Sequence, residues 1–377
     1  MTLILLVAAA FCGLITFLHL ASIAAAVWRC RPTPRRARPA DDAPPVSIVR
    51  PVCGIENHIF ETLGSSFALD YPRYELVFCV ASPADPVVDV VERLIATHPG
   101  VPARLLTGDT KISPNPKLNN VVKGWRAAAH DWIVLADSNV AMPPDYVQRL
   151  LARWRADSGL VASPPVGCDP VGFAAELECA FLNTHQARWQ YAADSLGFGF
   201  AQGKTMLWRR TDLDHAGGIG ALAAEVAEDA AATKLVRHAG RRVHLVDAPF
   251  GQPLGRRSLA EVWHRQLRWA RLRRASFPQY FLPEILSGAL PPTIAVAIVA
   301  MELDQPVAAT AAGFVALWYG AEIGLARLAG WHVSWRSPVC AIARDLLMPA
   351  LFVMGWTGTA FVWRGNAMQV ARAGETR

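Results

Sequence analysis

Charged side chains are scarce in this 377-residue sequence: they make up 18% of it, whereas soluble domains usually carry about 25%. The glycine patterns GxGxxG and GxxxxGK[ST], typical of dinucleotide-binding and P-loop proteins, are absent. The seven cysteines show no CxxC or CxxH spacing, so we expect neither a disulfide framework nor a zinc site. No internal repeat is present. The sequence instead contains 53% hydrophobic residues, and these are concentrated at its two ends.

The first apolar run, residues 3–27, contains no charged side chain and exceeds the ~20 residues that a helix needs to cross a bilayer. Five arginines lie between residues 29 and 38, and no basic residue precedes the run. This arrangement favours a retained membrane anchor over a cleaved signal peptide. By the positive-inside rule, the N-terminus lies outside and the main domain is cytoplasmic.

Apolar runs near the C-terminus predict further membrane segments. Residues 285–301 and 307–328 are candidates for spanning helices, and 346–363 is a third that Pro349 interrupts. Basic residues flank this third run on both sides: Arg336, Arg344, Arg364 and Arg372. Such flanks argue against a simple span and fit a re-entrant or interfacial hairpin, and the sequence leaves this topology open.

The net charge of +6 raises the alternative of nucleic-acid binding. The arginines cluster beside apolar segments, however, so we expect an anionic membrane surface as partner and no nucleic acid. The expected organisation is an N-terminal transmembrane helix (1–28), a Pro/Arg-rich linker (29–45), a catalytic domain (46–255), an amphipathic interfacial segment (256–283), membrane helices (284–364) and a cytoplasmic tail (365–377).

Between the apolar ends, short buried runs alternate with helical patterns. The expected strands are 46–50, 75–80, 103–106, 132–136, 159–164, 205–208 and 243–246. The expected helices are 60–68, 86–97, 114–129 and 173–191. This alternation predicts an α/β fold with a mostly parallel sheet and right-handed crossovers.

Acidic and polar residues follow several of these predicted strands. Asp137 ends the strand 132–136, where a carboxylate can reach a ligand beyond the carboxyl end of a sheet. Asp85 follows an earlier strand and fits either a ligand contact or the N-cap of a helix. The segment PNPKLNN places Lys117 and Asn119 at a helix start, which suits a diphosphate, although an exposed lysine after a turn is the simpler alternative.

Two motifs in the second half also carry candidate chemistry. Asp229, in AED, is a candidate general base, with a solvated acidic helix end as the alternative. On a helix, Glu228 would point away from Asp229 by about 100°, and Glu225 would lie on the same side and raise the pKa of Asp229. The motif RQLRW puts three side chains on one helix face, which suits a diphosphate and a sugar or a membrane surface. These residues are Arg265, Arg268 and Trp269.

Together, NPKLNN, ADS, AED and RxxRW resemble the inverting glycosyltransferases with a GT-A fold, over about residues 46–274. More narrowly, they resemble the ceramide glucosyltransferases of glycosyltransferase family 21, which is related to family 2. The resemblance implies that Asp85 lies near the uracil and ribose of a UDP-sugar donor, that Asp137 holds Mg²⁺ or Mn²⁺, and that Asp229 is the base. Asn139 stands where many relatives carry a second aspartate, so the metal would rely on diphosphate oxygens and water.

The implied activity is the transfer of one hexose, most simply from UDP-glucose, to the primary hydroxyl of ceramide with inversion. Arg265 in RxxRW fits single transfer, because processive relatives show glutamine there. The alternatives are another lipid acceptor, such as a hopanoid polyol or a polyprenyl phosphate, and a membrane scaffold or transporter with a degenerate domain. The implied location is a bacterial-type inner membrane, in a multi-pass arrangement. The sequence leaves open the sugar and the role of His185, which is offset by one position from the histidine of the family.

Overall fold

The computed structural model describes residues 2–363 and 365–370. The chain forms two compact units. The sheet unit comprises Pro32–Asp169 and Ala193–Gly255, and the helical unit comprises the described residues of 1–31, 170–192 and 256–377. Of the basic residues that flank the third apolar run, Arg364 and Arg372 lie outside the described residues.

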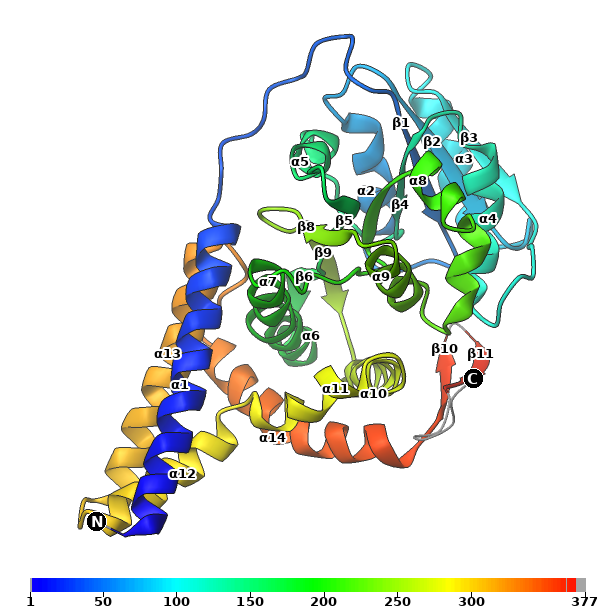
Figure 1. Ribbon diagram of the computed structural model, residues 1–377. Helices are drawn as coiled ribbons and strands as arrows, with labels where there is room; N and C mark the ends of the chain where they lie inside the picture. Colours follow the sequence, from blue (N-terminus) through cyan, green and yellow to red (C-terminus); the bar gives the residue numbers. More distant parts are fainter. Residues whose placement is uncertain (1, 364, 371–377) are drawn as a thin grey trace. The chain divides into compact units, whose positions relative to one another are not determined.

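The sheet unit is built on a seven-stranded sheet with the order β3-β2-β1-β4-β7-β5-β8 (Figure 1). The strands are β1 (Val46–Pro51), β2 (Tyr74–Val80), β3 (Ala103–Thr107), β4 (Trp132–Ala136), β5 (Ser158–Ser163), β7 (Thr205–Arg209) and β8 (Arg242–Leu245). The pairs within β3-β2-β1-β4 are parallel, β5 and β8 are also parallel, and β7 is antiparallel to both of its neighbours. The predicted mostly parallel α/β sheet is therefore confirmed, with one reversed strand.

Helices connect these strands along the chain. They are α2 (Ile59–Gly64), α3 (Val87–Thr97), α4 (Pro116–Ala127), α5 (Tyr146–Ala152), α8 (Arg210–His215) and α9 (Glu228–His238). Short 3₁₀ helices extend α2 (Ser65–Ala68) and precede α9 (Ile219–Ala224). A separate two-stranded sheet pairs β6 (Val166–Val171) with β9 (Gly251–Arg256).

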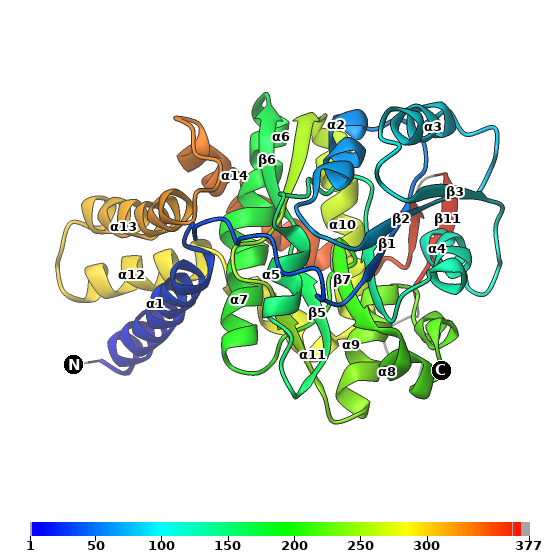
Figure 2. The same cartoon turned by 90° about the horizontal axis from the view of Figure 1, so that it is seen from above.

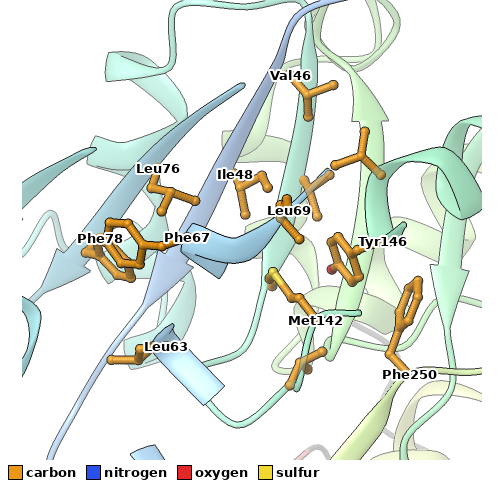
Figure 3. Packing of buried hydrophobic residues seen from close by; sticks show 14 of the residues in the cluster. Val46, Ile48, Leu63, Phe67, Leu69, Leu76, Phe78, Met142, Tyr146 and Phe250 are labelled. Carbon is orange, nitrogen blue, oxygen red and sulfur yellow. The ribbon is translucent and has the colours of Figure 1, made fainter. Parts of the chain in front are cut away.

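One face of the sheet carries a continuous apolar core (Figure 3). Phe67 stacks on Phe78 of β2 with the ring centroids 5.8 Å apart, and Tyr146 of α5 lies 4.3 Å from Phe250. Each large side chain of this kind contributes about 1.5–3 kcal/mol when it is fully buried. Helix α4 packs closely on β1 and β2, because a Cβ at Gly124 would lie only 2.5 Å from Val49 and from Cys79. The core therefore fixes the parallel strands whose ends carry the candidate site.

The helical unit contains long apolar helices. Helices α1 (Leu3–Cys30), α12 (Leu290–Glu302) and α13 (Val307–Leu328) lie side by side in both views (Figures 1 and 2). The remaining helices are α6 (Phe173–Cys179), α7 (Arg188–Ser195), α10 (Leu259–Ser276), α11 (Pro278–Phe281) and α14 (Ser337–Thr357), with a π-helical segment, Ala180–Ala187, between α6 and α7. Within the described residues, α1, α13 and α14 are each long and apolar enough to cross a membrane. The protein is accordingly membrane-associated.

Two of the predicted membrane segments have different bounds in the structure. The run 285–301 is not one helix: a 3₁₀ segment ends at Leu286, α12 begins at Leu290, and the two parts are bent by 42°. The run 346–363 is not one element either, because α14 begins at Ser337 and ends at Thr357, with Pro349 inside it. Residues Ala360–Trp363 form strand β10, which pairs with β11 (Asn366–Gln369).

A buried ion cluster lies inside α14, in the part of the helix that precedes the predicted apolar run. Arg344, fully buried in this helix, donates to both carboxylate oxygens of Glu322 on α13 at 2.9 and 3.1 Å. It also donates to Asp345 at 2.7 Å. The interpretation of Arg344 as a flanking charge is therefore wrong. The arginine is instead part of the packing between helices.

Candidate functional site

The carboxylate of Asp137 lies directly after β4 and between two lysines. Its Oδ1 is 2.7 Å from Lys117 Nζ, and its Oδ2 is 2.9 Å from Lys204 Nζ. The carboxylate is 21% exposed and the lysine side chains are 12% and 16% exposed, so the three charges are shielded but not sealed from solvent. This position is the polar end of a buried apolar strand, as the sequence predicts.

Lys117 is held in place by the start of α4. The amide oxygen of Asn115 accepts hydrogen bonds from the backbone N–H groups of Lys117 and Leu118, and Pro116 occupies the first helical position. The ammonium group of Lys117 contacts Asp137, Glu228 at 2.7 Å and the carbonyl oxygen of Gly203. An ammonium group has three donors, so these contacts use all of them.

Glu228 and Asp229 occupy the first turn of α9. A Cβ placed on Gly203 would lie 2.7 Å from Glu228 Oε1, 2.8 Å from Lys117 Nζ and 3.5 Å from Asp229 Oδ2. Both carboxylates therefore face Gly203, and the expectation that Glu228 points away from Asp229 is wrong. The side chain of Glu228 is long enough to reach Lys117 from the first turn of the helix. The angle between successive Cα–Cβ bonds therefore does not decide where its carboxylate lies.

These two acidic residues have different bonding environments. Glu228 uses one oxygen for Lys117 and accepts a hydrogen bond from Asn115 Nδ2 at 2.7 Å with the other. Asp229 accepts hydrogen bonds from two backbone donors, Gly203 N at 3.1 Å and Ala230 N at 2.8 Å. Both oxygens of Glu228 are therefore bound by side chains of the protein, whereas the carboxylate of Asp229 can accept a proton.

The pKa values of the cluster follow from this arrangement. Burial, followed by the charge of Glu228, raises the pKa of Asp229 to about 6. Burial alone would raise the pKa of Asp137, but Lys117 and Lys204 outweigh it and hold that pKa well below its usual value. Burial alone would lower the pKa of Lys117, but the charges of Asp137 and Glu228 outweigh this effect and raise that pKa. At neutral pH, Asp137 is therefore ionised, and Asp229 is ionised but close to its titration range.

The predicted influence of Glu225 on Asp229 is not what raises this pKa. Glu225 adopts an extended backbone before α9 and forms an ion pair with Lys234. It does not lie one helical turn before Asp229, because the helix begins only at Glu228. The adjacent Glu228 supplies the charge that we had assigned to Glu225.

Asp85 lies beyond the end of β2, where it organises backbone. Its two oxygens accept hydrogen bonds from Gly54 N at 2.9 and 3.0 Å, and Oδ1 also accepts from Val87 N at the start of α3 at 2.9 Å. The strands that precede Asp85 and Asp137 are not neighbours in the sheet, because β1 lies between β2 and β4. Since β1, β2 and β4 are parallel, both carboxylates still follow the same edge of the sheet.

Asn119 contacts the protein itself in this structure. Its amide oxygen accepts from the backbone N–H groups of Ile112 and Ser113, and its amide nitrogen donates to Ser113 O. The side chain is buried, with 6% of the residue exposed. Asn119 thus shapes the loop before α4.

Sequence reasoning missed three residues around Asp137. Arg50, fully buried at the end of β1, donates to the carbonyl oxygens of Asp137 at 2.9 Å, Ser138 at 3.1 Å and Val140 at 3.0 Å. Lys204 also contacts Asn139 Oδ1 at 3.0 Å. An arginine inside an apolar strand, and a lysine directly after a glycine-rich segment, were the available signals for Arg50 and Lys204. Gly203, the third, had no signal beyond its residue type.

The RQLRW segment lies on α10, in the helical unit. Arg265 donates to Glu178 of α6 at 2.6 Å, and the carboxylate of Glu178 is almost fully buried. The guanidinium of Arg268 lies 5.5 Å from the ring centroid of Trp363, and Trp269 is half-buried. In the same unit, His185 is buried and contacts the hydroxyl of Ser287 at 3.0 Å.

Two further observations concern the cavity of the sheet unit and groups of metal-ligating side chains. A cavity of about 340 Å³ in the sheet unit is lined by Trp208, Asp212, Arg241 and their neighbours, and none of the predicted site residues lines it. Within residues 2–363 and 365–370, no three His, Cys, Asp or Glu side chains are grouped so that they could hold a metal ion.

Comparison with known proteins places these features in a family. The family model for glycosyl transferase family 21 matches residues 14–376. A ceramide glucosyltransferase of Caenorhabditis elegans is 26% identical over 385 residues, which cover 99% of this chain and 82% of the relative. A ceramide glucosyltransferase of Komagataella phaffii is 30% identical over 288 residues, which cover 61% of this chain and 56% of the relative.

Among solved structures, a mannosyltransferase from Pyrobaculum calidifontis, in complex with GDP-Man and Mn²⁺, is similar with a TM-score of 0.51. It is 17% identical, and the match covers 90% of this chain and 99% of that chain. This similarity confirms the predicted GT-A fold. The family match extends over nearly the whole sequence and confirms the predicted resemblance. The chain belongs to glycosyl transferase family 21.

Proposed function

We propose that this glycosyltransferase transfers one hexose from a UDP-sugar, UDP-glucose in the first instance, to the primary hydroxyl of ceramide with inversion. The observation that carries the proposal is the alignment of 99% of the chain with a ceramide glucosyltransferase. The described site supports it chemically, since it offers an ionised carboxylate beside two lysines and a second carboxylate with a pKa near neutrality.

In this proposal, Asp137 is the protein ligand for Mg²⁺ or Mn²⁺. The residues fit such an ion, because Asp137 is ionised, lies at a strand end and remains partly exposed. The ion, when bound, would neutralise charge on the departing diphosphate. Arg50 fixes the backbone of the Asp137 loop, and Lys117 keeps the Oδ1 side of the carboxylate in position.

Asp229 is the proposed general base. Its carboxylate takes the proton of the acceptor hydroxyl while the hydroxyl oxygen bonds to the anomeric carbon and the bond from that carbon to the diphosphate breaks. A single displacement of this kind inverts the configuration. The raised pKa suits the role, because a base works best when its pKa lies near the operating pH. Glu228, with both oxygens engaged, is a positioning residue in this account.

The other predicted site residues have proposed roles of two kinds. Asp85 contacts the uridine of the donor and also orders the loop at Gly54. Arg265 and Arg268 meet the diphosphate, and Trp269 meets the sugar or the lipid. Lys117 and Asn119, which we expected to touch the donor, act mainly through the contacts described above.

The proposed setting is a bacterial-type inner membrane with the sheet unit in the cytoplasm. Helix α1 is uncharged from Leu3 to Val27, and arginines follow it. Arginines that follow a spanning segment favour the cytoplasmic side. A two-chain lipid acceptor stays in the bilayer, because exposing each CH₂ group costs about 0.8 kcal/mol.

The proposal is tested with the full chain in lipid nanodiscs that contain ceramide, a polyprenyl phosphate or a hopanoid polyol. UDP-glucose, UDP-galactose, UDP-glucuronate and UDP-N-acetylglucosamine are supplied in turn with Mn²⁺ or Mg²⁺. We expect β-linked hexosylceramide from an α-linked donor, identified by NMR of the anomeric proton. In the Asp229→Asn variant, kcat should fall by about 10²–10⁴. Transfer only to another lipid would overturn the acceptor assignment, and an α-linked product would overturn inversion.

A further inference from the structure

One buried carboxylate in the helical unit faces two arginines. Glu178 of α6 has only 1% of its side chain exposed. Its Oε1 accepts a hydrogen bond from Arg265 Nη1 at 2.6 Å, and its Oε2 lies 3.7 Å from Arg257 Nε. The second contact is an ion pair without a hydrogen bond, since both of these atoms are buried and form no hydrogen bond within the described residues.

This cluster carries more positive than negative buried charge. The side chains of Arg257 and Arg265 are 12% and 18% exposed, so water screens their charges only in part. Glu261, at the start of α10, is exposed and bonded to Ser258 in the capping box, so solvent screens its charge more fully. A guanidinium stays charged and donates in several directions. The two arginines can therefore accept a further anion.

From these contacts we infer that Arg257 and Arg265 form a phosphate-binding pair, which Glu178 positions, and that the ligand of this pair is the diphosphate of the donor. The inference rests on the proposed function, in which Arg265 meets the diphosphate. It adds Arg257 as a second phosphate-binding residue. Phosphate oxygens suit such a pair, because a planar guanidinium can donate two parallel hydrogen bonds to an oxyanion.

The single carboxylate explains how two arginines can be held near each other without being neutralised. Two guanidinium groups repel each other, and the charge of Glu178 between them compensates for that repulsion. One carboxylate leaves one of the two positive charges uncompensated, whereas a second buried carboxylate would cancel it. Because Glu178 is almost closed off from solvent, an entering anion meets the more exposed arginines.

The test compares UDP with uridine, which has the same base and ribose and no phosphate. The full chain is used in phosphatidylcholine nanodiscs at saturating Mn²⁺, with UDP titrated by calorimetry and uridine by ligand-observed NMR. The variants are Arg257→Met, Arg257→Lys and Glu178→Asp, which moves the carboxylate and keeps its charge. Arg273→Met is the matched control, because Arg273 lies on α10 and donates to both oxygens of Glu284 at 2.7 and 2.8 Å.

We expect Arg257→Met to weaken UDP binding by roughly tenfold, because a charge-assisted contact to the diphosphate is lost. Uridine binding should be unchanged in this variant. Arg257→Lys should recover part of the UDP affinity, since it restores the charge without the planar group. Glu178→Asp should weaken UDP binding by roughly threefold, although the charge of the cluster is the same. Loss of folded protein would lower the number of UDP sites in the titration and leave the affinity unchanged.

An unchanged UDP affinity in Arg257→Met, or an equal loss in Arg273→Met, would overturn the inference. The phosphate of a lipid headgroup offers the same oxygens, and phosphatidylglycerol added to the nanodiscs separates the two sources. If this lipid co-purifies with the unchanged protein and not with Arg257→Met, at equal UDP affinity, the donor assignment is overturned. Failure of the proposed function looks different: hexose transfer to ceramide would be absent while the UDP titrations still decide the role of Arg257. Absence of UDP binding by the unchanged protein would overturn both.

Discussion

Replacing Lys117 with methionine tests the electrostatic account of the site most simply. Methionine keeps most of the length of the side chain and removes its charge. In the folded protein, Asp137 Oδ1 and Glu228 Oε1 would each lose a partner at 2.7 Å. Glu228 is only 9% exposed, so water replaces little of what is lost.

The expected destabilisation is large. Removing one partner of a buried ion pair costs about 3–5 kcal/mol, because it leaves a charge buried without compensation. Asp137 retains Lys204, and Glu228 retains Asn115, so we expect the lower part of that range. The loss should shrink at acid pH, since a protonated Asp137 no longer needs the lysine. In the unchanged protein, the lowered pKa of Asp137 gives stability that is present above its unfolded pKa and is lost as pH falls toward the folded value.

The assay is thermal unfolding in detergent, followed by tryptophan fluorescence at one scan rate and at several pH values. Lys123→Met is the matched control, because Lys123 lies on the same helix and contacts Gly108 O and the amide oxygen of Asn120. The Lys117→Met/Glu228→Gln double variant should recover part of the loss. Equal shifts in Tm for Lys117→Met and Lys123→Met, or a loss independent of pH, would refute the reasoning.

Three further predictions concern activity and packing. Below about pH 6, kcat/KM should fall tenfold per pH unit as Asp229 takes up a proton, and Asp229→Asn should show no such fall. For stability the sign is reversed: the raised pKa of Asp229 favours folding below its ordinary value of 3.8, and that contribution is lost as pH rises through about 6. Gly203→Ala should lower kcat/KM by tenfold or more, because the new Cβ would displace Glu228 and Lys117. Gly220→Ala is the control and should leave kcat/KM unchanged, because a Cβ at Gly220 has no atom within 4 Å. Arg344→Met should lower the free energy of unfolding by about 3–5 kcal/mol, because Glu322 and Asp345 stay buried without their cation. Arg327→Met, at an exposed position, should cost little, and adding Glu322→Gln to Arg344→Met should restore part of the Tm. An equal loss in both arginine variants would contradict this account.

The sheet could be predicted because its strands are short apolar runs that end in polar residues. The strand 132–136 has the predicted bounds, and helix α4 begins at the predicted PNPKLNN segment. These features are local, since apolar runs and Asn or Pro at a helix start act over a few residues. Charges inside apolar helices were harder to interpret. Arg344 looked like a flank because its partner Glu322 is 22 residues earlier in the sequence.

The geometry of the site depends on residues that are distant in sequence, and sequence patterns could not supply it. Lys117, Gly203 and Glu228 meet at one point, although 86 residues separate the first two. Asn119 resembles a ligand contact in the sequence, but the backbone of the preceding loop satisfies its amide. Arg50 was missed because its acceptors are backbone carbonyl groups, which carry no sequence pattern.

The most direct test of the account is a structure of the full chain with UDP and Mn²⁺, with the metal located by anomalous scattering. We predict that the metal is found at the carboxylate of Asp137 together with the diphosphate, and that the uridine lies beside Asp85. A metal and diphosphate bound elsewhere, such as in the cavity beside Trp208, would contradict it.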